Sequence, residues 1–135
     1  MFSKQELIRF QHCDPAGIVF YPRYVEMINA TVEDWFAEAV GFDFAKIHVE
    51  MNSAIPVVSL QVDFRGPSRL GELLQLDLQV ERLGTSSIHL SIGASVDEDV
   101  KFNARLSLVH ISKEDYRPRP WPAVLRDTIA SQMDS

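Results

Sequence analysis

The chain has 135 residues, a length at which one compact domain is the commonest arrangement. Apolar residues make up 46 % of it and charged residues 24 %, which is typical of a globular protein and excludes a disordered or fibrous one. The 13 Lys and Arg residues are outnumbered by 19 Asp and Glu residues, giving a net charge of −6. This negative charge disfavours binding to the phosphate backbone of a nucleic acid.

The cysteine content and the N-terminus predict where the protein acts. The single cysteine, Cys13, has no partner for an internal disulfide, and Met1–Glu6 lacks the basic-then-apolar order of a signal peptide. No apolar run approaches the roughly 18 residues that a membrane helix needs. We therefore expect one soluble domain over residues 1–135, located in the cytoplasm, with neither a membrane nor a nucleic acid as partner.

The first half of the chain predicts a short strand, a loop and one long helix. We expect the strand over Gln5–Phe10, and Asp-Pro and Gly mark a loop over Gln11–Gly17. The helix is expected to begin near Pro22, because proline is tolerated in a first helical turn, and to stop at Gly41. Its apolar residues recur at spacings of three and four, which places them on one face: Val25, Ile28, Val32, Trp35, Phe36 and Ala39. A further short helical piece is expected over residues 44–50.

The second half changes to a period of two, which is typical of strands. Apolar and polar residues alternate over four runs: residues 58–64, 74–80, 88–96 and 100–108. Gly66–Ser68 turns the chain after the first run. The later runs are joined by short turns at Leu83–Ser86 and Asp97–Asp99, and connections this short favour antiparallel hairpins. The sequence therefore predicts an α+β fold, in which an antiparallel sheet buries its apolar face under the long helix.

The end of the chain predicts a departure from the sheet. The alternation slips by one residue after Leu108, which indicates a bulge or a change of the buried side. His89 and His110 fall at polar positions of their strands, so both are expected at the surface or in an interface. Prolines at 118, 120 and 122 end the sheet, and Ala123–Gln132 is expected to form a peripheral helix.

The segment His12–Tyr24 is the strongest candidate for chemistry. It places the carboxylate of Asp14 in a loop that leads into the N-terminus of the long helix. A helix N-terminus offers unpaired N–H groups and a positive dipole end, which suit a carbonyl oxygen that gains negative charge. One carboxylate beside one oxyanion site is sufficient for acyl transfer to water. The structural alternative is that Asp14 only caps an Asx turn before Pro15.

The same segment resembles a known family signature. Leu7–Phe10 followed by His-Cys-Asp-Pro-Ala-Gly-Ile-Val-Phe-Tyr-Pro-Arg-Tyr is similar to the motif of the 4-hydroxybenzoyl-CoA thioesterase family, which belongs to the hotdog-fold acyl-CoA thioesterases. The resemblance implies a five-stranded antiparallel sheet wrapped around one long central helix. It also implies hydrolysis of an acyl-CoA thioester to an acid and free coenzyme A, without a metal or another cofactor.

The resemblance further implies roles for individual residues. Asp14 is the catalytic carboxylate, as nucleophile or general base, and the backbone N–H of Tyr21 is the oxyanion donor. Residues that contact substrate are expected in three further places: Ile55, Pro56 and Val57 along the thioester channel, Gly84, Thr85 and Ser86 at the coenzyme A arm, and Val109–Lys113 at the nucleotide end. The turn carries no basic side chain, so Arg82 and Lys113 are the candidate cations for the phosphates.

The family's active site lies at a subunit interface, so the resemblance implies a homodimer or a homotetramer. The uncovered sheet face and edge strands of the predicted fold favour the same assembly.

Other functions remain open at this point. A hotdog module that binds acyl-CoA without hydrolysing it is the main alternative, and a carboxylate at position 14 argues against it. A dehydratase of the same fold is disfavoured, because the loop lacks the Asp and His spacing of such enzymes. His12, Cys13 and Asp14 are consecutive and cannot converge on one metal ion without other ligands, so no metal site is expected. The acyl group is expected to be aromatic or of short to medium length, given aromatic residues such as Phe20 and Tyr24.

Overall fold

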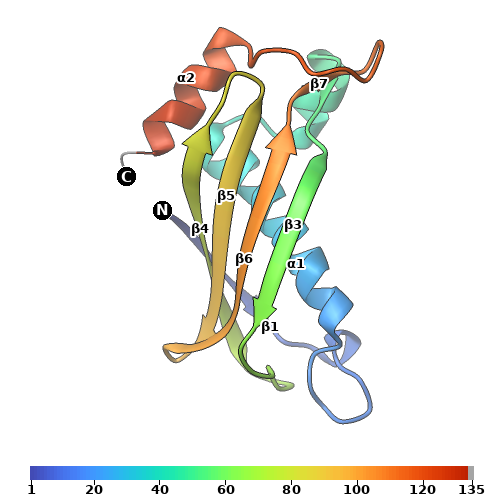
Figure 1. The fold of residues 1–135 in the computed structure, drawn as a ribbon. Helices are drawn as coiled ribbons and strands as arrows, with labels where there is room; N and C mark the ends of the chain where they lie inside the picture. The colour runs from blue at the N-terminus through green and yellow to red at the C-terminus, as the bar shows by residue number, and fades with distance from the viewer. Residues whose placement is uncertain (134–135) are drawn as a thin grey trace.

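A computed structural model describes residues 1–133 of the chain (Figure 1). Its main element is an antiparallel five-stranded sheet with the strand order β1-β4-β5-β6-β3. The strands are β1 (Phe2–Leu7), β3 (Val57–Phe64), β4 (Leu73–Leu83), β5 (Ser87–Val96) and β6 (Asp99–Val109). The long helix α1 (Tyr21–Trp35) runs across one face of this sheet, so the predicted α+β arrangement is confirmed.

Helix α1 starts and stops where its sequence predicts. Pro22 lies in the first turn, and the helix continues through a wider π-helical turn, η2 (Phe36–Val40), to Gly41. Gly41 has a φ of 87°, a left-handed conformation that glycine adopts without steric cost. The predicted second piece forms from Phe44 onwards and includes the π-helical turn η3 (Lys46–Glu50).

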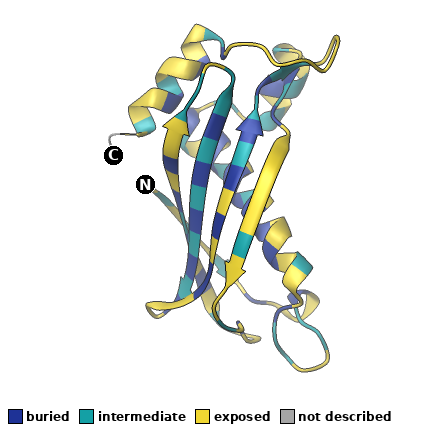
Figure 2. Ribbon diagram, in the orientation of Figure 1, coloured by how far each residue is buried: buried dark blue, intermediate teal, exposed yellow. Residues whose placement is uncertain are grey.

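The core lies between α1 and the facing side of the sheet. Figure 2 shows buried and half-buried residues alternating along β5, which is the pattern of a strand with one face on the core. Ile28, Val32 and Trp35 of the helix belong to one buried cluster with four leucines of the sheet, and each of these side chains is at most 2 % exposed; the leucines are Leu74, Leu76 and Leu78 of β4 and Leu90 of β5. Each such side chain contributes about 1.5–3 kcal/mol through burial, so this layer supplies much of the stability.

Strand β3 departs from the prediction of four half-buried strands. It lies at the edge of the sheet, paired only with β6, and most of its apolar residues are exposed, whereas Val62 is half-buried against the core. Val58 is 61 % exposed and Leu60 is 40 % exposed. Alternation alone predicted a buried face, but it does not tell an edge strand from a central one, because both carry the same period of two.

The connection between β3 and β4 is not a hairpin. The two strands are not neighbours, because β3 pairs with β6 while β4 lies between β1 and β5. Residues 65–72 therefore cross the end of the sheet. This crossing loop becomes a neighbour of the loop that carries Asp14, which sequence spacing did not indicate.

The first strand and the last strand also differ from the prediction. β1 covers Phe2–Leu7 instead of Gln5–Phe10, because its register pairs Phe2 with Leu78 and Leu7 with Leu73, and the next residues turn through the short 3-10 helix η1 (Phe10–His12). After β6 the chain leaves the sheet and forms β7 (Ile111–Ser112), which pairs with β2 (Ser53–Ala54). The buried side does not change at the slip in alternation, because His110 is buried like Leu106 and Leu108, while Val109 and Ile111 are only half-buried.

The C-terminal segment is anchored more firmly than predicted. The helix α2 (Ala123–Gln132) forms over the expected residues, but Leu125 and Ile129 are fully buried, so it is part of the core. His110 is buried rather than on the surface: its Nδ1 bonds the Arg119 carbonyl at 2.8 Å and its Nε2 bonds Ser53 Oγ at 2.9 Å. Two polar partners make a histidine acceptable inside the fold. None of the helices within residues 1–133 has the length and hydropathy to span a membrane.

Candidate active site

Asp14 lies in a loop that is closed by its own hydrogen bonds. The backbone N–H of Asp14 donates to the Ile18 carbonyl at 2.9 Å, and the Gly17 N–H donates back to the Asp14 carbonyl at 3.0 Å. The Asp14 carboxylate accepts the Ala16 N–H at 2.9 Å, which is the Asx turn that the structural alternative required. The second carboxylate oxygen is outside this turn and the residue is half-buried. The Asp14 carboxylate can therefore close the Asx turn with one oxygen and leave the other for a reaction.

The same loop delivers the chain to the N-terminus of α1. The Phe20 N–H donates to the His12 carbonyl at 2.9 Å, and Tyr21 follows as the first helical residue. Tyr21 has no helical carbonyl four residues earlier, so its N–H is one of the unpaired donors of the first turn. The His12 ring steadies the loop, because its Nδ1 accepts the Arg9 N–H at 2.8 Å. Asp14 and the helix N-terminus therefore belong to one hydrogen-bonded unit.

The crossing loop between β3 and β4 is a second support that sequence reasoning missed. Ser68 accepts the Val19 N–H on its carbonyl at 2.9 Å, and the Leu70 N–H donates to the Gly17 carbonyl at 3.1 Å. Ser68 also bonds the hydroxyl of Tyr24, which is buried in the core rather than available to a substrate. The partners are 44 residues apart in the chain, so neither periodicity nor a local motif could have revealed the contact.

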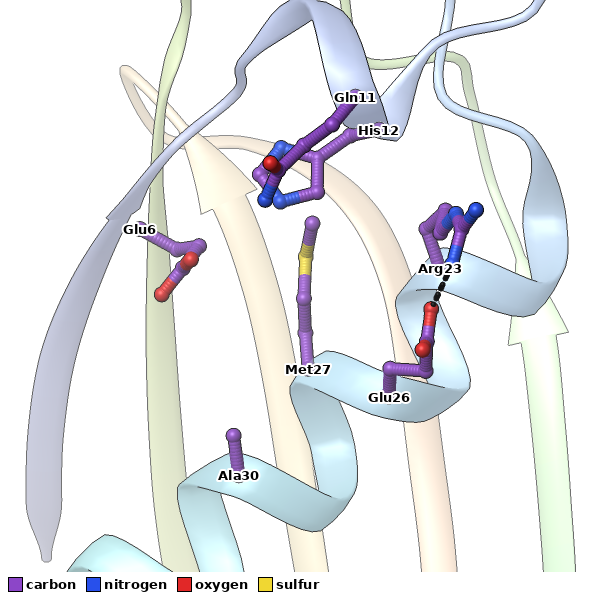
Figure 3. Close-up of a pocket in the computed structure, with 7 residues that line it drawn as sticks. All are labelled: Glu6, Gln11, His12, Arg23, Glu26, Met27 and Ala30. Atoms are coloured by element: carbon purple, nitrogen blue, oxygen red, sulfur yellow. Dashed lines mark hydrogen bonds and ion pairs between the residues drawn. The ribbon is translucent and has the colours of Figure 1, made fainter.

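A cavity of about 450 Å³ lies beside this unit, between β1 and α1 (Figure 3). Met27 points from α1 toward His12, and Arg23 forms an ion pair of 2.7 Å with Glu26 at the rim. Glu6 and Gln11 add polar groups to the wall, and Met27 and Ala30 add apolar ones. Asp14 does not line the cavity.

The residues expected at the coenzyme A arm gather at one place. The carbonyls of Gly84, Thr85 and Ser86 each accept a hydrogen bond from the C-terminal part of the chain. The donors are Arg126 Nη1 at 2.7 Å, the Trp121 N–H at 3.0 Å and the His110 N–H at 2.7 Å, in that order. The β4–β5 turn is consequently held rigid, and Arg126 is a cation at this turn that the sequence interpretation did not name.

The expected channel and nucleotide-end residues lie next to this turn. The Val109 N–H donates to the Pro56 carbonyl at 3.1 Å; Pro56 and Val57 are exposed, whereas Ile55 is buried in the core. Lys113 is exposed and donates from Nζ to the His48 carbonyl at 3.0 Å. Arg82 is exposed on β4, next to a register shift after Val80.

The loop after Lys113 is organised by Asp115. The Arg119 guanidinium donates to the Asp115 carboxylate at 2.7 Å and the Arg117 N–H donates to it at 3.0 Å. The bond from Arg119 is the main reason, and that from Arg117 the second, that the pKa of Asp115 lies below its usual value. This carboxylate accordingly stays ionised in mild acid, so its ion pair with Arg119 persists there.

One chain does not bring all the expected site residues together. Figure 1 places the β4–β5 turn beside α2 at one end of the sheet, and the loop between β1 and α1 at the other end. Strand β3 links the two, because Val57 begins it near the turn and the Phe64 ring lies 6.4 Å from that of Tyr21 at the opposite end. Asp14 and Tyr21 are therefore separated from the other predicted residues by the length of the sheet.

No cluster of three or more metal-binding side chains occurs within residues 1–133. The Cys13 sulfur lies 3.5 Å from the Arg9 carbonyl, and His12 Nδ1 is occupied by the Arg9 N–H. The three consecutive candidates His12, Cys13 and Asp14 thus have separate local partners.

Comparison with known proteins assigns the family. The sequence pattern described as "Thioesterase superfamily" matches residues 16–102, which is more than half of the chain. The chain belongs to the thioesterase superfamily. The match begins two residues after Asp14, so membership rests on the helix and the sheet rather than on the carboxylate. Membership supports a thioester hydrolase as the class of enzyme.

Relatives of this superfamily member carry more specific names. A 1,4-dihydroxy-2-naphthoyl-CoA hydrolase of Synechococcus elongatus is 24 % identical over 134 residues, covering 98 % of both chains. The crystal structure of a 1,4-dihydroxy-2-naphthoyl-CoA thioesterase from Synechocystis superimposes with a TM-score of 0.89 at 20 % identity, covering 99 % of this chain and 98 % of that one. A gentisyl-coenzyme A thioesterase superimposes with a TM-score of 0.83 at 20 % identity, covering 93 % of this chain and 99 % of that one. These structures show that the thioesterase-superfamily chain has the hotdog fold.

Proposed function

We propose that this protein hydrolyses an acyl-CoA thioester to a carboxylic acid and free coenzyme A. The observation that carries the proposal is the hydrogen-bonded unit that joins Asp14 to the N-terminus of α1, in a chain of the thioesterase superfamily. A carboxylate and a set of unpaired N–H groups are the two components that thioester hydrolysis requires. A module that only binds acyl-CoA has no use for a carboxylate beside the thioester carbonyl.

Two routes are compatible with Asp14. As a nucleophile, its carboxylate attacks the carbonyl carbon, the thiolate of coenzyme A leaves, and water then hydrolyses the mixed anhydride to restore Asp14. As a general base, it takes a proton from a water molecule that attacks the carbonyl carbon, and the departing thiolate receives that proton. On either route the carbonyl oxygen becomes negative and is stabilised by the Tyr21 N–H, a contribution of about 10²–10³-fold in rate for one such donor.

A complete site requires a second copy of the chain. Strand β3 leaves one edge unpaired, and its exposed side chains continue onto α1 as an apolar surface that comprises Val58, Leu60, Phe64, Phe20, Tyr21 and Val25. Two copies joined at this edge by a two-fold axis run their β3 strands antiparallel. The β4–β5 turn of one copy then lies beside the Asp14 loop of the other. This arrangement unites the two groups of site residues that one chain keeps apart.

The second copy sets the roles of the remaining residues. Pro56 and Val57 of the partner would line the channel, and its Gly84–Ser86 turn would meet the coenzyme A arm. Arg82 and Lys113 would face the phosphates. Ile55 acts from the core beneath the channel, since its side chain is 5 % exposed.

The acyl group is proposed to be aromatic. The relatives described above are named for 1,4-dihydroxy-2-naphthoyl-CoA and gentisyl-coenzyme A, and each of these substrates is a thioester of a hydroxylated aromatic acid. The motif around Asp14 is similar to that of the 4-hydroxybenzoyl-CoA enzymes, whose substrate is another hydroxylated aryl thioester. The shared chemistry is a phenolic ring attached to the thioester carbonyl.

A panel of thioesters tests this function. We expect free coenzyme A to be released from 1,4-dihydroxy-2-naphthoyl-, gentisyl- and 4-hydroxybenzoyl-CoA, and more slowly from acetyl- and hexanoyl-CoA, when the thiol is measured with a chromogenic reagent. Tight binding of these compounds without release of thiol would favour the non-catalytic module. Faster turnover of the aliphatic members would contradict the aromatic assignment.

A further inference from the structure

The hydroxyl of Tyr24 makes an unusual pair of contacts in the core. The side chain is 3 % exposed, and its ring packs 5.8 Å from Phe64 and 5.1 Å from Phe102. Its hydroxyl donates to Ser68 Oγ at 2.7 Å and accepts the backbone N–H of Ser68 at 3.0 Å. Ser68 is fully buried. The side-chain oxygen and the backbone N–H of Ser68 therefore both bond the Tyr24 hydroxyl on α1.

From Ser68 the contacts continue to the loop that carries Asp14. The Ser68 carbonyl accepts the Val19 N–H at 2.9 Å, and its neighbour Arg69 forms a β-bridge with Ile18. The Ile18 carbonyl in turn accepts the Asp14 N–H at 2.9 Å. A continuous series of bonds thus runs from the Tyr24 hydroxyl, through the crossing loop, to the backbone of Asp14.

We propose that Tyr24 is a positioning residue for thioester hydrolysis: its hydroxyl fixes the Asp14 loop relative to the N-terminus of α1. The inference rests on the proposed function, since it assigns a role in that reaction. Tyr24 is on the first turns of α1, three residues after Tyr21, so it ties the loop to the same helix end that supplies the oxyanion donor. A displacement of about 1 Å between reacting groups can lower a rate by about 10²-fold.

The environment of Tyr24 supports this role over simple packing. A phenylalanine would fill the same space between Phe64 and Phe102, without a hydroxyl that must be satisfied in the interior. The Asp14 loop itself has few buried side chains besides Val19, so its position depends on these backbone bonds.

The test is Tyr24→Phe, with Thr31→Val as the matched control. Thr31 is a second fully buried hydroxyl on α1, but its Oγ1 donates to the Met27 carbonyl within the helix and reaches no loop. For Tyr24→Phe we expect kcat to fall about tenfold with KM changed less than about twofold, because the loop acts on the reacting groups and not on coenzyme A binding. Thr31→Val should leave both constants within about twofold of the wild type.

A second variant separates the two contacts with Ser68. Ser68→Ala keeps the backbone N–H that bonds Tyr24, so its kcat should fall only about two- to threefold. In the double variant kcat should match that of Tyr24→Phe, since both changes break one series of bonds. Equal kcat values for Tyr24→Phe and Thr31→Val would overturn the proposal, and so would multiplicative losses in the double variant.

Amide hydrogen exchange tests the series of bonds from Tyr24 to the Asp14 loop without an activity assay. In Tyr24→Phe the Val19 and Leu70 amides should exchange at least about tenfold faster, while β5 amides keep their protection, and Thr31→Val should leave Val19 and Leu70 unchanged. Unchanged protection in Tyr24→Phe would overturn the proposal. If the exchange result is as expected but the wild type hydrolyses no thioester, the proposed function is wrong, whereas the role of Tyr24 in holding the Asp14 loop is still supported.

Discussion

The Asp14 carboxylate accepts the backbone N–H of Ala16 at 2.9 Å, so the candidate catalytic group also shapes its own loop. This double role makes the choice of substitution decisive. An asparagine at position 14 keeps a side-chain oxygen that can accept the same N–H, whereas an alanine removes it.

Asp14→Asn should therefore fold like the wild type and lose most of its turnover. We expect a fall of about 10²–10⁴-fold in kcat, because an amide is neither a nucleophile nor a base. Asp14→Ala should lose turnover to the same extent and also about 0.5–1.5 kcal/mol of stability, since the turn bond is gone. Thiol release and thermal unfolding measure the two effects. Saturated turnover of Asp14→Asn equal to that of the wild type would exclude Asp14 from the chemistry.

The exposed edge of β3 predicts an assembly. Light scattering at micromolar concentration should give two or four times the 15.3 kDa of one chain, because the apolar surface of β3 and α1 needs a partner. Leu60→Glu should produce monomers and abolish turnover, since the site is built from two copies. Gln61→Glu is the control, because Gln61 faces the opposite side of the same strand. A monomeric wild type that turns over thioesters would contradict the composite site.

Arg82 and Lys113 predict how the coenzyme A phosphates are held. Both side chains are exposed, so each change to Ala should cost about 0.2–1 kcal/mol, which raises KM roughly 1.4- to 5-fold. The value of kcat should stay constant, because these contacts are alike in the ground and transition states. Added salt should imitate the substitutions in the wild type and affect the variants less.

The control for those cations is Arg105→Ala. Arg105 is exposed on the outer face of the sheet, and its removal changes the net charge by the same amount. Its KM should remain that of the wild type. If neither Arg82→Ala nor Lys113→Ala alters KM, and pantetheine thioesters react as well as full coenzyme A thioesters, phosphate recognition by these residues is wrong.

His110 predicts a stability effect far from Asp14. His110→Ala leaves the Arg119 carbonyl and the Ser53 hydroxyl without their partner and removes the ring contact with Trp121 at 5.2 Å. We expect a loss of about 1–3 kcal/mol in the free energy of unfolding by urea. His89→Ala removes a half-buried ring with a single bond to Ser107 and should cost less. Equal losses for the two variants would show that the buried bonds of His110 are unimportant.

Local patterns in the sequence determined most of the elements and the identity of the candidate loop. The spacing of Val25, Ile28 and Val32 requires a helix, and a proline near its start and Gly41 at its end mark its limits, because these signals act over a few residues. Alternation likewise predicted the hairpins from β4 to β6. The Asp14 motif was visible because its residues are contiguous in the chain.

Contacts between distant segments were decided only by the tertiary structure. Alternation in β3 could not reveal that the strand lies at an edge, since an edge strand and a central strand show the same period of two. The link between Tyr24 and Ser68 and the burial of His110 depend on which strands become neighbours, and that choice is made by the packing of the whole sheet. For the same reason the sequence named residues for one site, while the fold places them at the two ends of the sheet.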